Sequence, residues 1–182
     1  ASKKNDTKYQ KWYSQREFNP FLRNSWLLMA KAEYQNDDYL KSISTFSYIT
    51  RLFSNDPEAV AEARIWMVMA YGELGWIYEA EDVLKKIELA GAIPKGLEGE
   101  FAAANANLLV RQKKFKEAIP YLEKAADKAE SQRQRIRLKY LLGQAYEKMG
   151  NRTFAYKAYS DIGGLNTPYV FEMNAKLKQA EN

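Results

Sequence analysis

The sequence predicts an all-α protein, an α-solenoid built from repeated helix-turn-helix pairs. The prediction rests on two ladders, that is, two series of residues that recur along the chain with almost the same period. Four of the five prolines lie at steps of 37 residues or twice that: Pro20, Pro57, Pro94 and Pro168. A ladder of small residues has steps of 38, 38 and 37: Ser42, Ala80, Ala118 and Ala155. Periods of this length are typical of helical repeat arrays.

Each small residue of the second ladder is followed four positions later by a large apolar one: Phe46, Leu84, Leu122 and Tyr159. Residues at i and i+4 share one helix face, so the small residue lets another helix approach and the large one fills the space beside it. Apolar residues at helical spacing upstream predict the first helix of each pair. They are Trp26, Met29 and Ala30; Met67, Val68 and Tyr71; Ala102, Ala106 and Leu109; Leu142, Gly143 and Tyr146.

The expected elements follow in chain order. Residues 7–18 read as the second helix of an upstream repeat, with Trp12 in its bulky position. Four pairs follow, at 22–36 and 38–53, 57–74 and 77–90, 96–112 and 115–130, and 132–149 and 151–163. Residues 168–180 are expected to form one helix, either a cap or the first helix of another repeat, and its partly polar surface favours the cap. Pro120 falls inside a predicted helix, and we expect it to bend or delay that helix.

These elements give one array over residues 1–182, in which 1–20 end an upstream repeat and 168–182 form the cap. The repeats are expected at residues 21–56, 57–93, 94–130 and 131–167. The last repeat reads Leu142-Gly143, Tyr146, Gly150, Ala155, Tyr159 and Pro168. It resembles the tetratricopeptide repeat (TPR), whose pattern is W-x2-L-G-x2-Y, then A-x3-F, then P, with a period of about 34 residues. The three or four extra residues here are expected in loops or helix ends.

Several stretches carry a closer resemblance: 11–13 (Lys-Trp-Tyr), 17–21, 61–66, 118–125 and 140–144. They are similar to TPR lipoproteins of Bacteroidetes linked to gliding motility and type IX secretion, of the SprE/PorW type. The resemblance implies that this chain is one segment of a longer cell-envelope scaffold facing the periplasm. It also implies a lipid anchor on a cysteine upstream of this chain. The residues themselves leave a cytoplasmic location open.

The composition excludes several kinds of chemistry. The chain has no histidine and no cysteine, which removes Ser-His-Asp and Cys-His catalysis, zinc sites and thiol redox chemistry. Carboxylates cluster at Asp37-Asp38 and at 79–82, where second helices begin and acidic groups complement the helix dipole. The longest apolar run, Ile65 to Tyr71, has seven residues, too few to span a membrane. We therefore expect no catalysis, cofactor, metal or direct membrane insertion.

The net charge of +5 is unevenly distributed: residues 58–100 carry −5 and residues 101–150 carry +6. Arg133, Arg135 and Arg137 alternate, so a helix divides them between two faces, and no aromatic residue lies among them for base stacking. We therefore expect no nucleic-acid binding. The basic segment is interpreted as a solvated face, which in a second interpretation contacts the acidic repeat of a neighbouring molecule.

Stacked helix pairs form a superhelix whose concave face is lined by the first helix of each pair. Helical offsets from the core ladder predict protein-binding residues on that face. They are Asn24, Leu27, Lys31 and Tyr34; Ile65, Met69 and Glu73; Asn107 and Arg111; Arg137, Tyr140 and Gln144. Apolar anchors with a few polar groups suit an extended peptide or a partner helix. Two alternatives stay open: a spacer that self-associates, and an accessory domain of an enzyme outside this chain.

Overall fold

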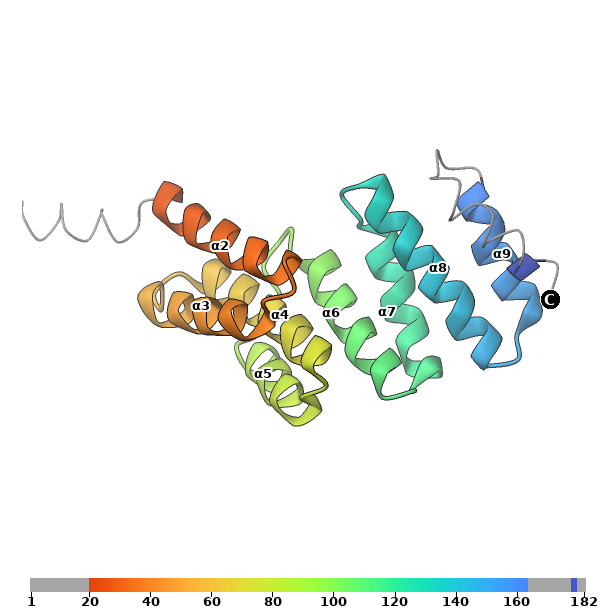
Figure 1. The fold of residues 1–182 in the computed structure, drawn as a ribbon, viewed down its shortest axis with the longest axis horizontal. Helices are drawn as coiled ribbons and strands as arrows, with labels where there is room; N and C mark the ends of the chain where they lie inside the picture. Colours follow the sequence, from red (N-terminus) through yellow and green to blue (C-terminus); the bar gives the residue numbers. More distant parts are fainter. Residues whose placement is uncertain (1–19, 164–177, 180–182) are drawn as a thin grey trace, which may run out of the picture. The chain divides into compact units, whose positions relative to one another are not determined.

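A computed structural model of the chain describes residues 20–163 and 178–179, and all of the regular secondary structure in that part is helical (Figure 1). The helices are α2 (Pro20–Gln35), α3 (Tyr39–Leu52), α4 (Pro57–Leu74), α5 (Ile77–Leu89), α6 (Glu98–Arg111), α7 (Phe115–Asp127), α8 (Gln132–Lys148) and α9 (Arg152–Gly163). The predicted all-α repeat fold is confirmed. The helix expected at 7–18 and most of that expected at 168–180 lie outside the described residues.

The chain divides after Pro94 into two compact units. In unit 1, α2 packs against α3, α3 against α4, and α4 against α5, and α2 also touches α4. In unit 2, α6 to α9 pack in the same consecutive manner. Each unit therefore holds two helix pairs, and in each the first helix of the second pair packs onto the second helix of the first pair.

In unit 1, the small residues of the ladder lie at helix crossings. Ser42 on α3 and Ala80 on α5 are both fully buried. The hydroxyl of Ser42 donates a hydrogen bond to the carbonyl of Ala30 on α2, at 3.0 Å, so this buried polar group is satisfied. One turn further along α3, the buried ring of Phe46 stacks against Trp66 of α4, with 6.3 Å between ring centroids. The small residue thus permits close approach and the large residue fills the adjacent space.

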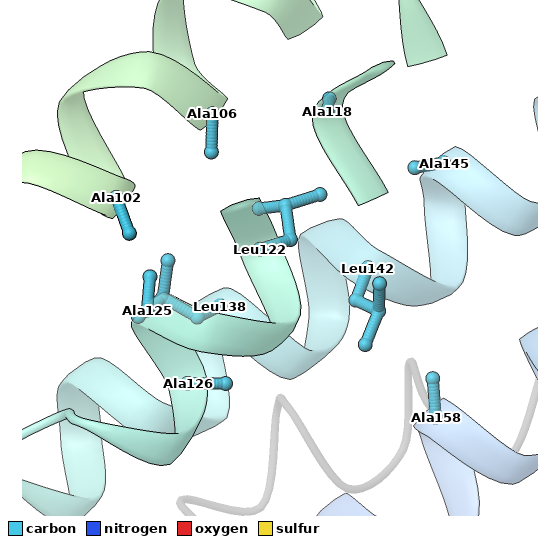
Figure 2. Close-up of a cluster of buried hydrophobic side chains, with 10 residues drawn as sticks. All are labelled: Ala102, Ala106, Ala118, Leu122, Ala125, Ala126, Leu138, Leu142, Ala145 and Ala158. Atoms are coloured by element: carbon cyan, nitrogen blue, oxygen red, sulfur yellow. The ribbon is translucent and has the colours of Figure 1, made fainter. Parts of the chain in front are cut away.

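In unit 2, the main apolar cluster takes side chains from all four helices, as Figure 2 shows. Ala118 and Leu122 of α7 lie in it together with Ala102 and Ala106 of α6. Most of its members are alanines, which is consistent with helices that approach closely. A second cluster joins α8 to α9 and consists of Ile136, Ala155, Tyr159 and Ile162.

The four turns within the pairs share one geometry. A residue with positive φ lies five positions before each small ladder residue: Asp37, Gly75, Lys113 and Gly150. In each turn, the N–H that follows this residue donates to the carbonyl five positions earlier, at 2.9 to 3.0 Å. This is the Schellman arrangement, which satisfies carbonyls left unpaired at the end of a helix. The turn conformation thus recurs with the same period as the buried ladder residues.

Pro120 does not delay its helix. α7 begins at Phe115, where the sequence predicts it, and runs through Pro120 to Asp127. The proline is exposed, so its ring meets solvent. The helix ends three residues earlier than predicted, and Ser131 caps α8 by accepting a hydrogen bond from the backbone N–H of Gln134, at 3.2 Å.

Candidate protein-binding surfaces

In unit 1, side chains of α2 and α4 meet along one seam. The ammonium of Lys31 lies 2.6 Å from a carboxylate oxygen of Glu62 and 4.9 Å from the ring centroid of Trp66. The hydroxyl of Tyr34 donates to Glu73 at 3.4 Å, and its ring meets the Trp66 ring edge-on at 5.3 Å. The first helices of two consecutive repeats therefore share one surface of half-buried charged and aromatic groups. We call these five residues the α2–α4 seam.

A second set of contacts ties α2 to the N-terminal end of α4. The guanidinium of Arg23 lies 3.2 Å from Asp56 and 3.3 Å from Glu58. Asp56 also caps α4 by accepting a hydrogen bond from the N–H of Ala59, at 3.0 Å. Arg23 further donates to the side-chain oxygen of Asn24 at 3.2 Å. These bonds hold the α2–α4 crossing at the end remote from Tyr34.

The predicted site residues of unit 1 separate into two groups. Asn24 is exposed, and Met69 is half-buried, as are Lys31, Tyr34 and Glu73 of the seam. Leu27 is only 4% exposed and Ile65 is 0% exposed, so both belong to the core and are excluded from the candidate surface. The physical reason is that α2 and α4 each pack against α3 and also touch each other, so more of each helix is covered than one apolar stripe predicts.

In unit 2, the predicted residues lie on α6 and α8. Asn107 accepts a hydrogen bond from Nε of Arg111 at 2.7 Å, one turn apart on α6. On α8, Arg137 is exposed, while the half-buried ring of Tyr140 packs at 5.5 Å from the buried ring of Tyr159. Tyr140 thus contributes to the packing of α8 on α9 as well as to the surface.

A hollow of about 230 Å³ lies between the α6–α7 turn and the C-terminal half of α8. Four of the residues that line it are apolar, and we call them the floor: Val110, Phe115, Leu141 and Ala145. The other four are polar or charged, and we call them the rim: Gln144, Glu147, Lys148 and Lys178, with 4.0 Å between the charged atoms of Glu147 and Lys178. The accessible surface of the lining is somewhat more polar than apolar. Of the predicted candidates, Gln144 lines this hollow. The floor comes from three helices, so no single periodic pattern in the sequence could have identified it.

Basic residues adjoin the lining residues Val110 and Phe115 along the chain. The α6–α7 turn reads Arg111-Gln112-Lys113-Lys114-Phe115-Lys116, and all four of its basic residues are exposed. Lys148 is also exposed and forms no ion pair with a residue of the described part of the chain. The hollow therefore has two lysines and one glutamate in its lining, and the segments that contribute this lining carry further exposed basic residues.

Tyr146 links three helices of unit 2. Its hydroxyl donates to Glu123 of α7 at 2.8 Å, and its ring stacks with Phe154 of α9 at 5.3 Å. Burial, together with the hydrogen bond to a carboxylate, raises the pKa of Tyr146 to about 12. This tyrosine therefore stays neutral, as a hydrogen-bond donor, well above neutral pH.

The aromatic residues Trp76 and Tyr78 at the α4–α5 turn lie on the surface. Trp76 is 45% exposed and Tyr78 is 86% exposed. The ring of Trp76 stacks on Tyr71 at 6.0 Å, and burial raises the pKa of Tyr71. One face of Trp76 is thus occupied by its own helix pair, while Tyr78 projects into solvent.

Across 20–163 and 178–179, no three acidic side chains gather closely enough to hold a metal ion. None of the helices described there has the length and apolar character needed to cross a bilayer.

Consecutive helix pairs with small residues at their crossings form an α-solenoid of helical repeats, a fold found in tetratricopeptide-repeat proteins. The chain is similar in structure to MamA from Desulfovibrio magneticus RS-1, with a TM-score of 0.62 at 18% identity over 87% of this chain and 84% of that one. It is also similar to YrrB, a TPR protein with an unusual peptide-binding site, with a TM-score of 0.56 at 18% identity over 86% and 75% of the two chains.

A third similar structure is a Podospora anserina chain of nearly identical TPR-like repeats, with a TM-score of 0.64 at 15% identity over 87% of this chain and 83% of that one. At these identities the likeness establishes the fold. No protein-family model matches the sequence, and no curated protein matches it.

Proposed function

We propose that this chain is a non-catalytic protein-binding scaffold that holds a peptide or a partner helix on its first-helix surfaces. The observation that carries the proposal is the α2–α4 seam, where the aromatic groups Tyr34 and Trp66 lie beside the charged groups Lys31, Glu62 and Glu73. Partly accessible aromatic anchors surrounded by polar groups are typical of protein interfaces.

The fold supports the same proposal. Among the similar structures, YrrB is a TPR protein with a peptide-binding site, and its likeness to this chain makes binding of a peptide a natural use of the surface. In unit 2 the corresponding helices α6 and α8 present Asn107, Arg111 and Arg137. Both units thus offer polar groups that could fix the register of a bound chain.

A finer proposal concerns the cellular role. The sequence segments similar to Bacteroidetes lipoproteins support a place in the cell envelope, facing the periplasm, in the assembly of secretion or motility components. The lipid anchor in this proposal lies upstream of the chain. The test is a pull-down from envelope extract of the source cells, followed by mass spectrometry of the bound proteins.

The bait proteins for this experiment follow from the surface residues. One variant carries Arg111→Glu and Arg137→Glu in unit 2, and another carries Asn24→Ala and Met69→Ala in unit 1. A matched control carries Lys124→Glu and Lys157→Glu, at exposed positions of the second helices α7 and α9. It changes the net charge by the same amount as the unit 2 variant. Circular dichroism establishes that each bait is folded.

The scaffold proposal expects specific proteins that bind the native bait and the control but are lost with at least one of the two surface variants. Proteins that bind all four baits equally would mean that the first helices are not the binding surface. An extract that yields only proteins common to an empty resin would contradict protein binding in the envelope.

A second candidate function is a self-associating spacer. Exposed carboxylates on α5, at Glu79, Asp82 and Glu88, and exposed guanidinium groups on α8, at Arg133 and Arg137, favour it. Opposite charges on two surfaces of one chain allow head-to-tail contact between copies. Sedimentation of the purified chain at two salt concentrations tests this alternative.

A further inference from the structure

We infer that the hollow in unit 2 binds one apolar side chain of an acidic peptide. The inference deepens the proposed scaffold function and rests on it, because it names the chemistry of the bound chain. It commits to a peptide in which an apolar residue is flanked by aspartate or glutamate. Three observations support the inference: the floor residues are apolar, they pack against the core of unit 2, and basic residues lie in the segments that line the hollow.

The apolar floor residues pack against the buried core of unit 2. Val110, Phe115 and Leu141 are half-buried and pack against the main core cluster of unit 2, and Ala145 belongs to that cluster. A hollow backed by a close-packed core keeps its shape before a ligand arrives, which limits the ordering cost of binding. An apolar side chain that enters removes its own surface and that of the floor from water.

The surroundings select the charge of the ligand. Lys148 on the rim has no ion-pair partner in the described part of the chain, and Lys178 lies 4.0 Å from Glu147. The adjoining turn adds Arg111, Lys113, Lys114 and Lys116, all exposed. The same segments also carry the carboxylates of Glu147 and Glu117, so basic groups outnumber acidic ones. Carboxylates beside the apolar anchor of a peptide would therefore meet a complementary surface.

A peptide fits this surface better than a nucleic acid. Binding of single strands without sequence preference relies on several aromatic rings on which successive bases stack. Here the floor offers one aromatic ring, Phe115, among Val110, Leu141 and Ala145. An aliphatic recess suits a side chain such as leucine, isoleucine or methionine.

The test is a selection from a phage-displayed library of random peptides on the intact chain. Enriched peptides are synthesised with a fluorophore, and their dissociation constants are measured by fluorescence anisotropy. We expect a shared apolar residue flanked by Asp or Glu, and a loss of affinity of about tenfold or more when that residue is changed to alanine. Higher salt should weaken binding, because exposed charges are screened over about 10 Å at 0.1 M.

Two variants probe the hollow from different directions. Gln144→Trp places an indole over the floor, and Lys124→Glu, at an exposed position of α7 that does not line the hollow, is the control. Lys148→Glu reverses an exposed rim charge and leaves the core untouched, so it serves even where the tryptophan variant fails to fold. The inference expects at least about tenfold weaker peptide binding for Gln144→Trp and for Lys148→Glu, and near-native binding for Lys124→Glu, which reverses a charge away from the hollow.

The outcomes separate this inference from the function on which it rests. Enriched peptides that bind all variants equally, or that are basic or lack an apolar residue, overturn the hollow and leave the scaffold standing. A selection that enriches no peptide, beside an extract that yields no partner, overturns both. Tight binding of a single-stranded oligonucleotide that Lys148→Glu abolishes, without peptide binding, would assign the basic turn to nucleic acid instead.

Discussion

The ring of Tyr159 on α9 occupies the space where a side chain on Gly143 of α8 would have to lie. A Cβ atom added to Gly143 would come too close to three carbons of that ring, and Tyr159 is fully buried. These two residues correspond to the glycine and the aromatic position of the TPR pattern. In this repeat, the glycine of the pattern therefore leaves room for the aromatic ring that the pattern places on the second helix.

Gly143→Ala should destabilise unit 2 by about 1–3 kcal/mol, because the methyl group overpacks the contact with Tyr159. Intrinsic helix propensity alone predicts the opposite sign, a gain of up to about 1 kcal/mol. Urea denaturation followed by circular dichroism decides between them. The cost of Gly143→Ala should shrink in a Tyr159→Leu background, and an unchanged cost there would refute the steric explanation.

Lys113→Gly should stabilise the chain by about 1 kcal/mol relative to Lys113→Ala. Lys113 has a φ of 60°, a left-handed conformation that is unfavourable for a residue with a Cβ atom. Both substitutions remove the same charge, so their difference isolates the backbone conformation. Thermal denaturation of the two variants measures it. Equal stabilities would show that the turn relaxes without strain.

Tyr146 should ionise with a pKa of about 12, above the ordinary value of 10.0. Because the folded-state pKa is raised, the contribution of this tyrosine to stability is complete below pH 10 and is lost as the pH rises toward 12. The measurement is the ultraviolet titration of tyrosinate, native protein minus Tyr146→Phe. Glu123→Gln should move the step in this difference curve to lower pH, because it replaces the charged acceptor.

Exchange of the charges at Lys31 and Glu62 should reveal their coupling. Lys31→Glu alone brings two carboxylates together in a half-buried place and should cost about 1–3 kcal/mol, between the values for exposed and buried pairs. The double variant Lys31→Glu with Glu62→Lys should recover part of that loss in denaturation experiments. Additive single effects would mean that the two side chains do not interact in solution.

If the chain self-associates, the association should be strongest at low salt. Opposite charges on α5 and α8 attract over a distance that shortens to about 3 Å at 1 M salt. Sedimentation velocity at low and high salt provides the measurement, with Glu79→Lys and Glu88→Lys as the variant expected to stay monomeric. Association that strengthens with salt would indicate an apolar contact instead.

Much of the fold was predictable because the repeat fixes many positions at once. The two ladders placed all eight described helices, and the largest difference is three residues, at the end of α7. The positive φ of Asp37 and Lys113 was not predicted, because neither residue type demands that conformation. Their position became evident only when aligned with Gly75 and Gly150.

The binding surface was less predictable than the fold. An offset along one helix gives a direction around that helix, but it does not say which neighbour covers it. Leu27 and Ile65 illustrate this limit, since both are buried among the packed helices of unit 1. The hollow beside Gln144 combines residues from three helices, and its shape depends on how their side chains pack.

The four buried ladder residues have a consequence for how such a protein can diversify. Ser42, Ala80, Ala118 and Ala155 are each fully buried, one per helix pair, and they set how closely the helices cross. All four lie on second helices, so substitutions at exposed positions of the first helices leave these crossings intact. Mutations on the surface can therefore change the binding specificity of such a protein while its helix packing is retained.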